Sequence, residues 1–113
     1  MKFGQLTIDE VHQDLAREVA GLCGVEVETI EPRDLPLRTP CDAAIVDWDY
    51  LGRGRGDLLK HLLTSLPKHA IALHTYDIDE QEYLRALGFA AVFPCLDADV
   101  FRALLAAIRP QAA

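Results

Sequence analysis

Short apolar runs alternate with helical stretches along this chain, and that alternation restricts its fold more than any other feature. Residues 42–47 and 69–73 are short apolar runs that end at polar residues, and residues 89–93 look similar. Such runs are typical of strands that are buried on both faces of a parallel sheet. Residues 25–30 alternate apolar and polar side chains, as a half-covered strand near an edge does, and residues 2–8 form the weakest strand pattern. The sequence therefore predicts five strands.

Four apolar stripes with helical spacing lie between or after these strands. They comprise Val11, Leu15, Val19 and Leu22; Leu58, Leu59, Leu62, Leu63 and Leu66; Tyr83, Leu84 and Leu87; and Val100, Leu104, Leu105 and Ile108. Residues three or four positions apart share one side of a helix, so each stripe is expected to pack against the sheet. Pro32, Pro36 and Pro40 lie where one further helix would come, and prolines at that density leave room for one turn at most.

This order of elements predicts an α/β fold in which helices cover both faces of a parallel sheet. Five strands in 113 residues fit a single domain over residues 1–113,. The expected architecture is a flavodoxin-like three-layer sandwich with strand order 2-1-3-4-5, in which the second helix is reduced or absent. Functional groups of such sheets gather at the carboxyl ends of the strands, near the switch point between strands 1 and 3.

Charge and composition exclude several classes of function. The chain has 11 basic and 18 acidic residues, a net charge of −7. An acidic surface argues against binding of nucleic acid or of an anionic membrane surface. No apolar run approaches the roughly 20 residues that a membrane-spanning helix needs, and the first ten residues lack the apolar stretch of a signal peptide. Cys23, Cys41 and Cys95 are expected to be reduced thiols, which predicts a cytoplasmic protein.

Acidic residues follow two strands that are expected to be neighbours. Asp9 and Glu10 come after the first strand, and Asp47 ends the third. Two carboxylates about 5 Å apart repel each other by about 3 kcal/mol at an effective dielectric constant near 20. Converging carboxylates therefore indicate a hard divalent cation, and Mg²⁺ is the usual one where phosphate is a further ligand. We expect Asp9, Glu10 and Asp47 to share a Mg²⁺ site, and Asp47→Asn to stabilise the metal-free protein.

The sequence resembles the receiver domain of two-component response regulators in three stretches. The family's first strand, acidic pair and first helix are similar to LTIDEVHQDLAREVAGLCGVEV. Its phospho-accepting strand and the next helix look like CDAAIVDWDYLGRGRGDLLKHL, and its hydroxyl-bearing strand, fourth helix and fifth strand look like HAIALHTYDIDEQEYLRALGFAAVFP.

The resemblance implies a role for each matching position. Asp47 would be the phospho-acceptor, and Asp9 and Glu10 would hold Mg²⁺ beside it. Thr75, or His74 if the register is one residue earlier, would occupy the position of the family's Ser or Thr hydroxyl. The chain would then be a signalling module and not an enzyme, with a histidine kinase or a downstream signalling protein as its partner.

The sequence also departs from the family. A lysine follows the fifth strand in receivers, whereas Pro94 and Cys95 stand here. This difference and the missing second helix favour an atypical, pseudo-receiver-like module that signals through protein contacts. A homodimer through residues 79–109 is one expected contact, because Tyr83, Phe101 and the Val100/Leu104 stripe belong to that part of the chain.

Two further interpretations concern a phosphatase and a zinc site. IVDWDYLG resembles the nucleophile strand of haloacid-dehalogenase-type phosphatases, with Asp47 as nucleophile and Asp49 as general acid. That family carries the motif near its N-terminus and adds a lysine and further acids downstream, which this chain lacks. A zinc site is not expected, because His12, His61 and His69 lie far apart in the sequence. His74 is expected to make a structural hydrogen bond.

Overall fold

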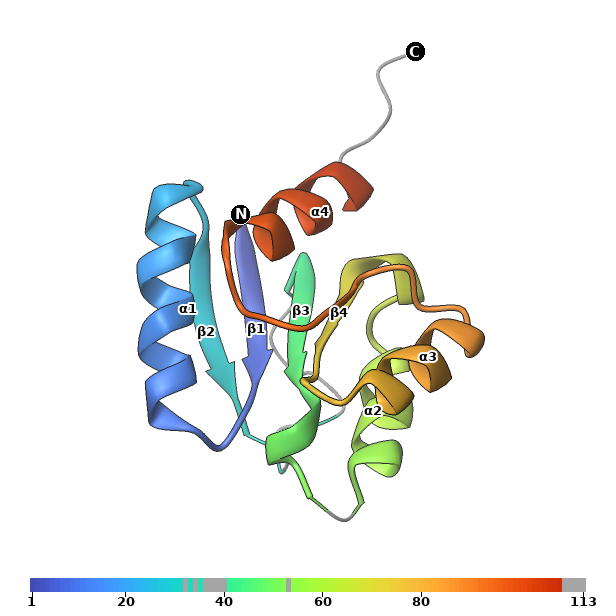
Figure 1. Cartoon of the computed structure of the whole chain (residues 1–113). Helices are drawn as coiled ribbons and strands as arrows, with labels where there is room; N and C mark the ends of the chain where they lie inside the picture. Colours follow the sequence, from blue (N-terminus) through green and yellow to red (C-terminus); the bar gives the residue numbers. More distant parts are fainter. Residues whose placement is uncertain (32, 34, 36–40, 53, 109–113) are drawn as a thin grey trace.

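Five parallel strands form one sheet, in the order β2-β1-β3-β4-β5 (Figure 1). The strands are β1 (Lys2–Leu6), β2 (Glu26–Ile30), β3 (Ala43–Asp47), β4 (Ile71–His74) and β5 (Val92–Phe93). The computed structural model describes residues 1–31, 33, 35, 41–52 and 54–108. The predicted fold class, strand number and strand order are confirmed, although β5 is much shorter than its apolar run.

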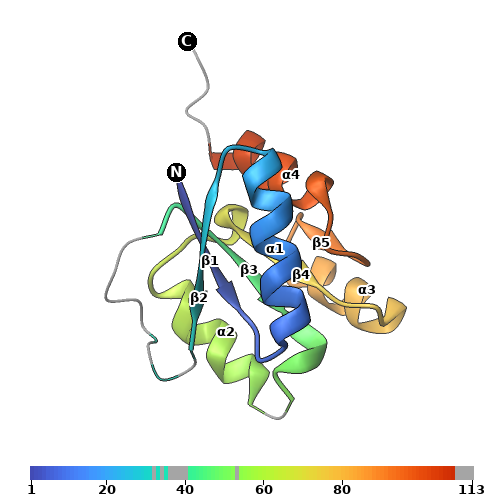
Figure 2. The ribbon, with the colours of Figure 1, turned by 90° about the vertical axis from the view of Figure 1, so that its left-hand side faces the viewer.

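Four α-helices flank the sheet within the described residues: α1 (Glu10–Leu22), α2 (Arg55–Leu63), α3 (Ile78–Ala86) and α4 (Ala98–Ile108). Two short 3₁₀ helices are η2 (Trp48–Tyr50) and η3 (Lys68–Ala70). Helices α1 and α4 pack together on one side of the sheet, α2 lies on the other side, and α3 contacts β5 (Figure 2).

The connection between β2 and β3 holds no α-helix in its described part, as expected. Pro32, Pro36 and Pro40, which carried that expectation, lie outside the described residues. Of the described helices, none is both long enough and apolar enough to cross a membrane.

The core lies on both faces of the three central strands. All five residues of β3 and all four of β4 are buried. On β1, the ring of Phe3 stacks on that of Phe101 from α4, with centroids 5.9 Å apart. Gly4 is also needed here, because a Cβ atom at that position would collide with the side chain of Ile30. The glycine that weakens β1 as a sequence pattern thus allows β2 to pack closely beside it.

The buried face of α1 differs from the predicted one. His12, Ala16 and Ala20 face the sheet, whereas Val11 and Leu22 are 73% and 83% exposed. The two faces are one residue apart, which is a rotation of about 100°. The space between α1 and the sheet accepts alanine at two successive turns, so the larger apolar side chains lie outside.

Candidate functional site

The sheet register brings three polar side chains into one row at the carboxyl ends of the central strands. Gln5 of β1 lies beside Ile45 of β3, so Thr7, two residues on, comes level with Asp47. Asp47 in turn lies beside His74 of β4. Neighbouring residues in a parallel sheet point to the same face, so Thr7, Asp47 and His74 all project toward one side.

Asp47 is the centre of this row, and both of its carboxylate oxygens accept hydrogen bonds. Thr7 Oγ1 donates to Oδ2 at 2.6 Å, and His12 Nδ1 lies 2.6 Å from the same oxygen. His74 Nδ1 lies 3.1 Å from Oδ1. Asp47 is only 2% exposed. The carboxylate is therefore enclosed by hydroxyl and imidazole groups and not by other acids.

His12 reaches Asp47 because the start of α1 is fixed from two sides. Asp9 is the N-cap of α1, and its side chain accepts a hydrogen bond from the His12 backbone N–H at 3.1 Å. Gln5 Nε2 donates to the His12 backbone carbonyl at 3.0 Å. The imidazole thus lies in the first turn of α1, over the end of β3.

The electrostatics of Asp47 follow from these contacts. Burial acts to raise its pKa, but hydrogen bonds from His74, Thr7 and His12, with the charge of His12, outweigh burial and lower the pKa below its ordinary value,. The carboxylate is therefore ionised at neutral pH and can only accept. It follows that Nδ1 of each imidazole carries the proton of its hydrogen bond.

The acidic residues predicted to join Asp47 lie elsewhere. The Asp9 carboxylate caps α1, and Glu10 is exposed beside a hollow of about 490 Å³ that Thr7, Gln13 and Arg33 also line. No contact of Asp9 or Glu10 with Asp47 is found among the described residues. The group of potential metal ligands in the described chain is instead His12, Asp47 and His74. The structure therefore does not support the expectation that Asp9, Glu10 and Asp47 converge.

Of the two candidates for the hydroxyl position, His74 is the one that contacts Asp47. Thr75 points the other way, and its Oγ1 donates to Asp49 Oδ1 at 2.6 Å. Asp49 also accepts from the Tyr76 backbone N–H at 2.8 Å. Asp49 thus orders the loop after β4. It makes no described contact with Asp47, whereas a nucleophile and its general acid would have to lie close together.

Aromatic rings enclose the two imidazoles. The ring of Tyr50 lies edge-on to His12 at 4.6 Å, and that of Tyr76 lies edge-on to His74 at 4.8 Å. The His12 and His74 rings are themselves 5.2 Å apart. Tyr76 is largely exposed, so this ring lies between the cluster and solvent.

Trp48 closes the same end of the sheet from the next position in the chain. It is buried, and its indole N–H donates to Glu80 of α3 at 2.8 Å. Arg55 of α2 pairs with Glu80 at 3.0 Å and lies over the Trp48 ring. The position beside His74 on β5 is occupied by Phe93, and Lys68 donates to the Leu87 carbonyl instead of approaching Asp47.

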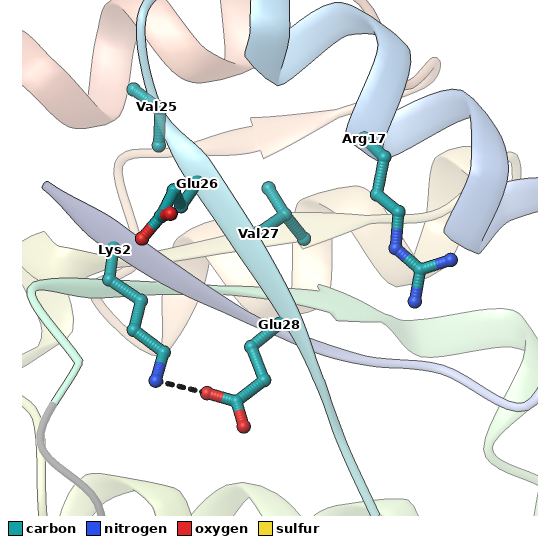
Figure 3. Close-up of a pocket in the computed structure, with 6 residues that line it drawn as sticks. All are labelled: Lys2, Arg17, Val25, Glu26, Val27 and Glu28. Carbon is teal, nitrogen blue, oxygen red and sulfur yellow. Dashed lines mark ion pairs between the residues drawn. The ribbon is translucent and has the colours of Figure 1, made fainter.

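A second hollow lies at the opposite end of the first two strands (Figure 3). Lys2 of β1 forms an ion pair with Glu28 of β2 there, and Arg17, Val25, Glu26 and Val27 complete the lining. Its two basic and two acidic side chains lie at the amino ends of the strands, away from the carboxyl ends where Asp47 lies. The cluster around Asp47 is therefore the better candidate for function.

Comparisons with solved structures identify the type of fold. The non-phosphorylated HemR receiver domain from Leptospira biflexa matches with a TM-score of 0.69 and 20% identity, over 98% of each chain. The bacteriophytochrome response regulator AtBRR matches with a TM-score of 0.69 and 11% identity, over 95% of this chain and 91% of that one. The adenylate cyclase from Rhodopirellula baltica matches with a TM-score of 0.71 and 17% identity, over 95% and 86%.

No protein-family model matches this sequence. No curated protein matches it either. The similarity to solved structures alone shows that the chain has a receiver-type fold.

Mg²⁺, which the receiver resemblance implies, fits poorly with the side chains around Asp47. Mg²⁺ prefers carboxylate, phosphate and water oxygens in octahedral geometry. Among the described residues, the side chains that form hydrogen bonds with Asp47 are one hydroxyl and two imidazoles. No step of the proposed function is therefore assigned to Mg²⁺.

Two members of this cluster were missed from the sequence. Thr7 directly follows β1, and nothing in the local sequence distinguishes it. Only the register of β1 against β3 shows that it lies level with Asp47. His12 was set aside because it is far from the other histidines in sequence. The signal that could have identified it is its spacing of four and eight residues from Ala16 and Ala20, which marks the true buried face of α1.

Proposed function

We propose that this protein is an atypical receiver-like signalling module that acts through protein contacts and does not need phosphorylation of Asp47. The observation that carries the proposal is the enclosure of the Asp47 carboxylate. Both oxygens are hydrogen-bonded and the residue is almost fully buried. A phosphoryl donor must approach one of these oxygens in line, and a buried, fully engaged oxygen is a poor nucleophile.

The charge around Asp47 supports the same conclusion. A transferred phosphoryl group would bring further negative charge that needs charge-assisted partners. Asp47 forms ion pairs with His12 and His74, and within the described residues it forms none with Lys or Arg. Asp47 therefore occupies the acceptor position of the receiver fold in a structural role.

Phosphorylation can be tested directly. The protein is incubated with acetyl phosphate and Mg²⁺ beside a conventional receiver domain as positive control, and intact mass is measured. We expect the control to gain one phosphoryl group and this protein to remain unmodified. A stoichiometric gain that disappears in Asp47→Asn would overturn the proposal.

The surface that we propose for protein contacts is the exposed stripe of α1. Val11, Leu15 and Leu22 are exposed at steps of four and seven residues, which places them on one side of the helix, and Ile8 is exposed just before its N-cap,. Glu10, Asp14 and Glu18 are acidic neighbours of this stripe, with Arg17 the basic residue among them. The acidic flanks favour an amphipathic partner segment with basic residues, and they oppose pairing of α1 with its own copy.

The residues predicted to form a homodimer through residues 79–109 differ in their exposure to solvent. Val100, Phe101 and Leu104 are fully buried in the core, so they cannot form an interface. Tyr83 of α3 and Leu87, which follows the helix, are exposed and line a hollow of about 280 Å³ between α2 and α3. Dimerisation through α3 remains a prediction and provides the competing outcome of the test.

The two surfaces can be separated with one probe. A synthetic amphipathic helix with leucine on one face and lysine on the flanks is titrated into labelled protein, and backbone NMR shifts are recorded. We expect shifts on α1, a loss of binding in the Val11→Gln/Leu22→Gln double variant, and full binding in the matched control Tyr83→Gln. Shifts confined to α3, or a dimer in sedimentation that Tyr83→Gln dissociates, would contradict the choice of α1.

Two further parts of the proposal concern activity and location. We assign no enzymatic activity, because Asp47 and Asp49, the two residues of the phosphatase alternative, have separate hydrogen-bond partners. Cys23, Cys41 and Cys95 form no disulfide within the described chain, which supports a reducing compartment such as the cytoplasm,. Sustained hydrolysis of a generic phosphate ester by the purified protein would contradict the first assignment.

A further inference from the structure

We propose that His12, Asp47 and His74 bind one divalent transition-metal ion of the Zn²⁺ class at the carboxyl ends of β3 and β4. The proposal goes beyond the receiver-like function and does not depend on it. It assigns to the centre of the fold a metal of a different chemical kind from the Mg²⁺ that the receiver resemblance implies.

The spacing of the three residues suits a shared ion. Each residue offers one ligand atom, and these atoms all lie within 4.8 Å of one another. Two ligand atoms that are each about 2.1 Å from a zinc ion can be at most about 4.2 Å apart. Small rotations of the imidazoles are therefore enough to close the ligand set. Asp9 holds the first turn of α1 and β4 holds His74, so two of the ligands come from fixed elements.

One nitrogen of His74 contacts Asp47, and the other has no hydrogen-bond partner among the described residues. His74 is 1% exposed, and its Nδ1 is engaged by Asp47. Its Nε2 is also buried and has no hydrogen-bond partner. Buried polar atoms in native structures almost always have a partner, so an unpaired one requires an explanation. Because Nε2 points away from Asp47, an ion shared with Asp47 would bind His74 through Nδ1, and Nε2 can take the proton that Nδ1 gives up,.

The charge of the cluster favours a cation as that ligand. The ionised Asp47 is buried, and its ion-pair partners are the two imidazoles. A buried charge is costly unless it is paired or coordinates a metal. A divalent ion would neutralise the carboxylate, and the hydroxyl of Thr7 would remain as an outer support that orients Asp47,.

The ligand types decide which cation fits. Two imidazoles and one carboxylate are typical ligands of zinc and of the neighbouring transition metals, whereas Mg²⁺ selects oxygen ligands. Tyr50 and Tyr76 lie edge-on to the imidazoles and would exclude bulk water from the ion. The exposed ring of Tyr76 lies on the side from which an ion could enter.

The first experiment measures affinity and stoichiometry. Metal-free protein competes with a chromophoric chelator for Zn²⁺, and Co²⁺ serves as a spectroscopic probe of imidazole coordination. We expect one ion per chain, a visible Co²⁺ band, and no competition by millimolar Mg²⁺. His74→Gln should weaken Zn²⁺ binding by at least about 100-fold, because it removes a direct ligand, whereas second-shell changes cost about 10–100-fold.

Matched controls separate this site from other ligands. His69→Gln removes an exposed histidine from η3, and Cys95→Ser removes an exposed thiol. Both variants should bind Zn²⁺ as the wild type does. Equal affinity in His74→Gln and wild type, or loss of binding only in Cys95→Ser, would overturn the proposal.

A second measurement does not require a folded variant. The imidazole nitrogen and proton resonances of the wild type are followed by long-range ¹H–¹⁵N NMR while Zn²⁺ is added. The signals of His12 and His74 should move together and saturate at one equivalent, while those of His61 and His69 stay in place. Unchanged His12 and His74 signals at saturating Zn²⁺ would show that hydrogen bonds alone join the buried cluster and that it binds no zinc, which would overturn the proposal.

Discussion

At the scale of single residues, the neighbours of Asp47 decide whether the substitution Asp47→Asn raises or lowers the free energy of unfolding. Convergence with Asp9 and Glu10 would have made Asp47 a source of repulsion in the absence of metal. In the structure, its neighbours are three hydrogen-bond donors. The carboxylate is therefore stabilising, and its loss would leave buried donors without a full set of acceptors.

We expect Asp47→Asn to lower the free energy of unfolding of the metal-free protein by about 1–3 kcal/mol at neutral pH, because buried donors lose a charged acceptor. Denaturant titrations of both proteins measure the difference. A more stable Asn variant would restore the repulsion model and contradict the hydrogen-bonded cluster.

The same contacts predict a dependence on pH. The pKa of Asp47 is lowered in the folded state, so its contribution is complete above the unfolded pKa of about 3.9 and is lost as pH falls through the folded value,. The stability gap between wild type and Asp47→Asn should therefore shrink below about pH 4. Thr7 and Tyr76 face the carboxylate from the segments that follow β1 and β4, and His12 and His74 face it from α1 and β4. His12→Gln is the control for the contribution of the imidazole on α1.

At the scale of elements, α1 is the segment whose sequence and structure differ most. Asp9 is one example: it was expected to hold a metal, and it caps the helix. We expect Asp9→Ala to lower the free energy of unfolding by about 1 kcal/mol, whereas Asp9→Asn, which keeps a capping side chain, should be almost neutral. Urea unfolding of the three proteins gives the values. A large loss in Asp9→Asn would mean that the negative charge itself is required.

The orientation of α1 gives a second contrast. Leu22 is largely exposed and Ala16 is fully buried. Leu22→Ala should change the free energy of unfolding by less than about 0.5 kcal/mol, whereas Ala16→Leu should reduce it by about 1–3 kcal/mol through overpacking. The predicted stripe implies the opposite ranking, so thermal melts of the two variants decide between the two orientations.

The number, order and approximate bounds of the elements could be predicted because apolar runs and stripes reflect burial directly. The contacts at the site could not, because they depend on strand register and on how α1 is rotated. A one-residue difference in either quantity exchanges His74 for Thr75 on β4, or His12 for Val11 on α1. Local patterns of one chain do not contain the register, and they indicate the rotation of α1 only through the spacing of two alanines, a weaker signal than the stripe of larger apolar residues.

At the scale of the whole molecule, the sheet is strongest at its centre and weakest at one edge. Strands β1, β3 and β4 lie between other strands and are almost entirely buried, whereas β5 has two residues at the edge of the sheet. Amides of β3 should therefore exchange with solvent only through global unfolding, and those of β5 through local opening. Native-state hydrogen exchange measures both. Equal protection of β3 and β5 would show that the short strand unfolds together with the core.

The contacts of Trp48 give the molecule an internal optical reporter. It is the single tryptophan of the chain, and it directly follows Asp47. Its indole is buried, donates to Glu80 and lies beneath the guanidinium of Arg55. Fluorescence from this ring therefore reads the junction of β3, α2 and α3 without an added label. Any event at the neighbouring carboxylate that shifts η2 should change the colour or intensity of this emission before the fold itself is affected.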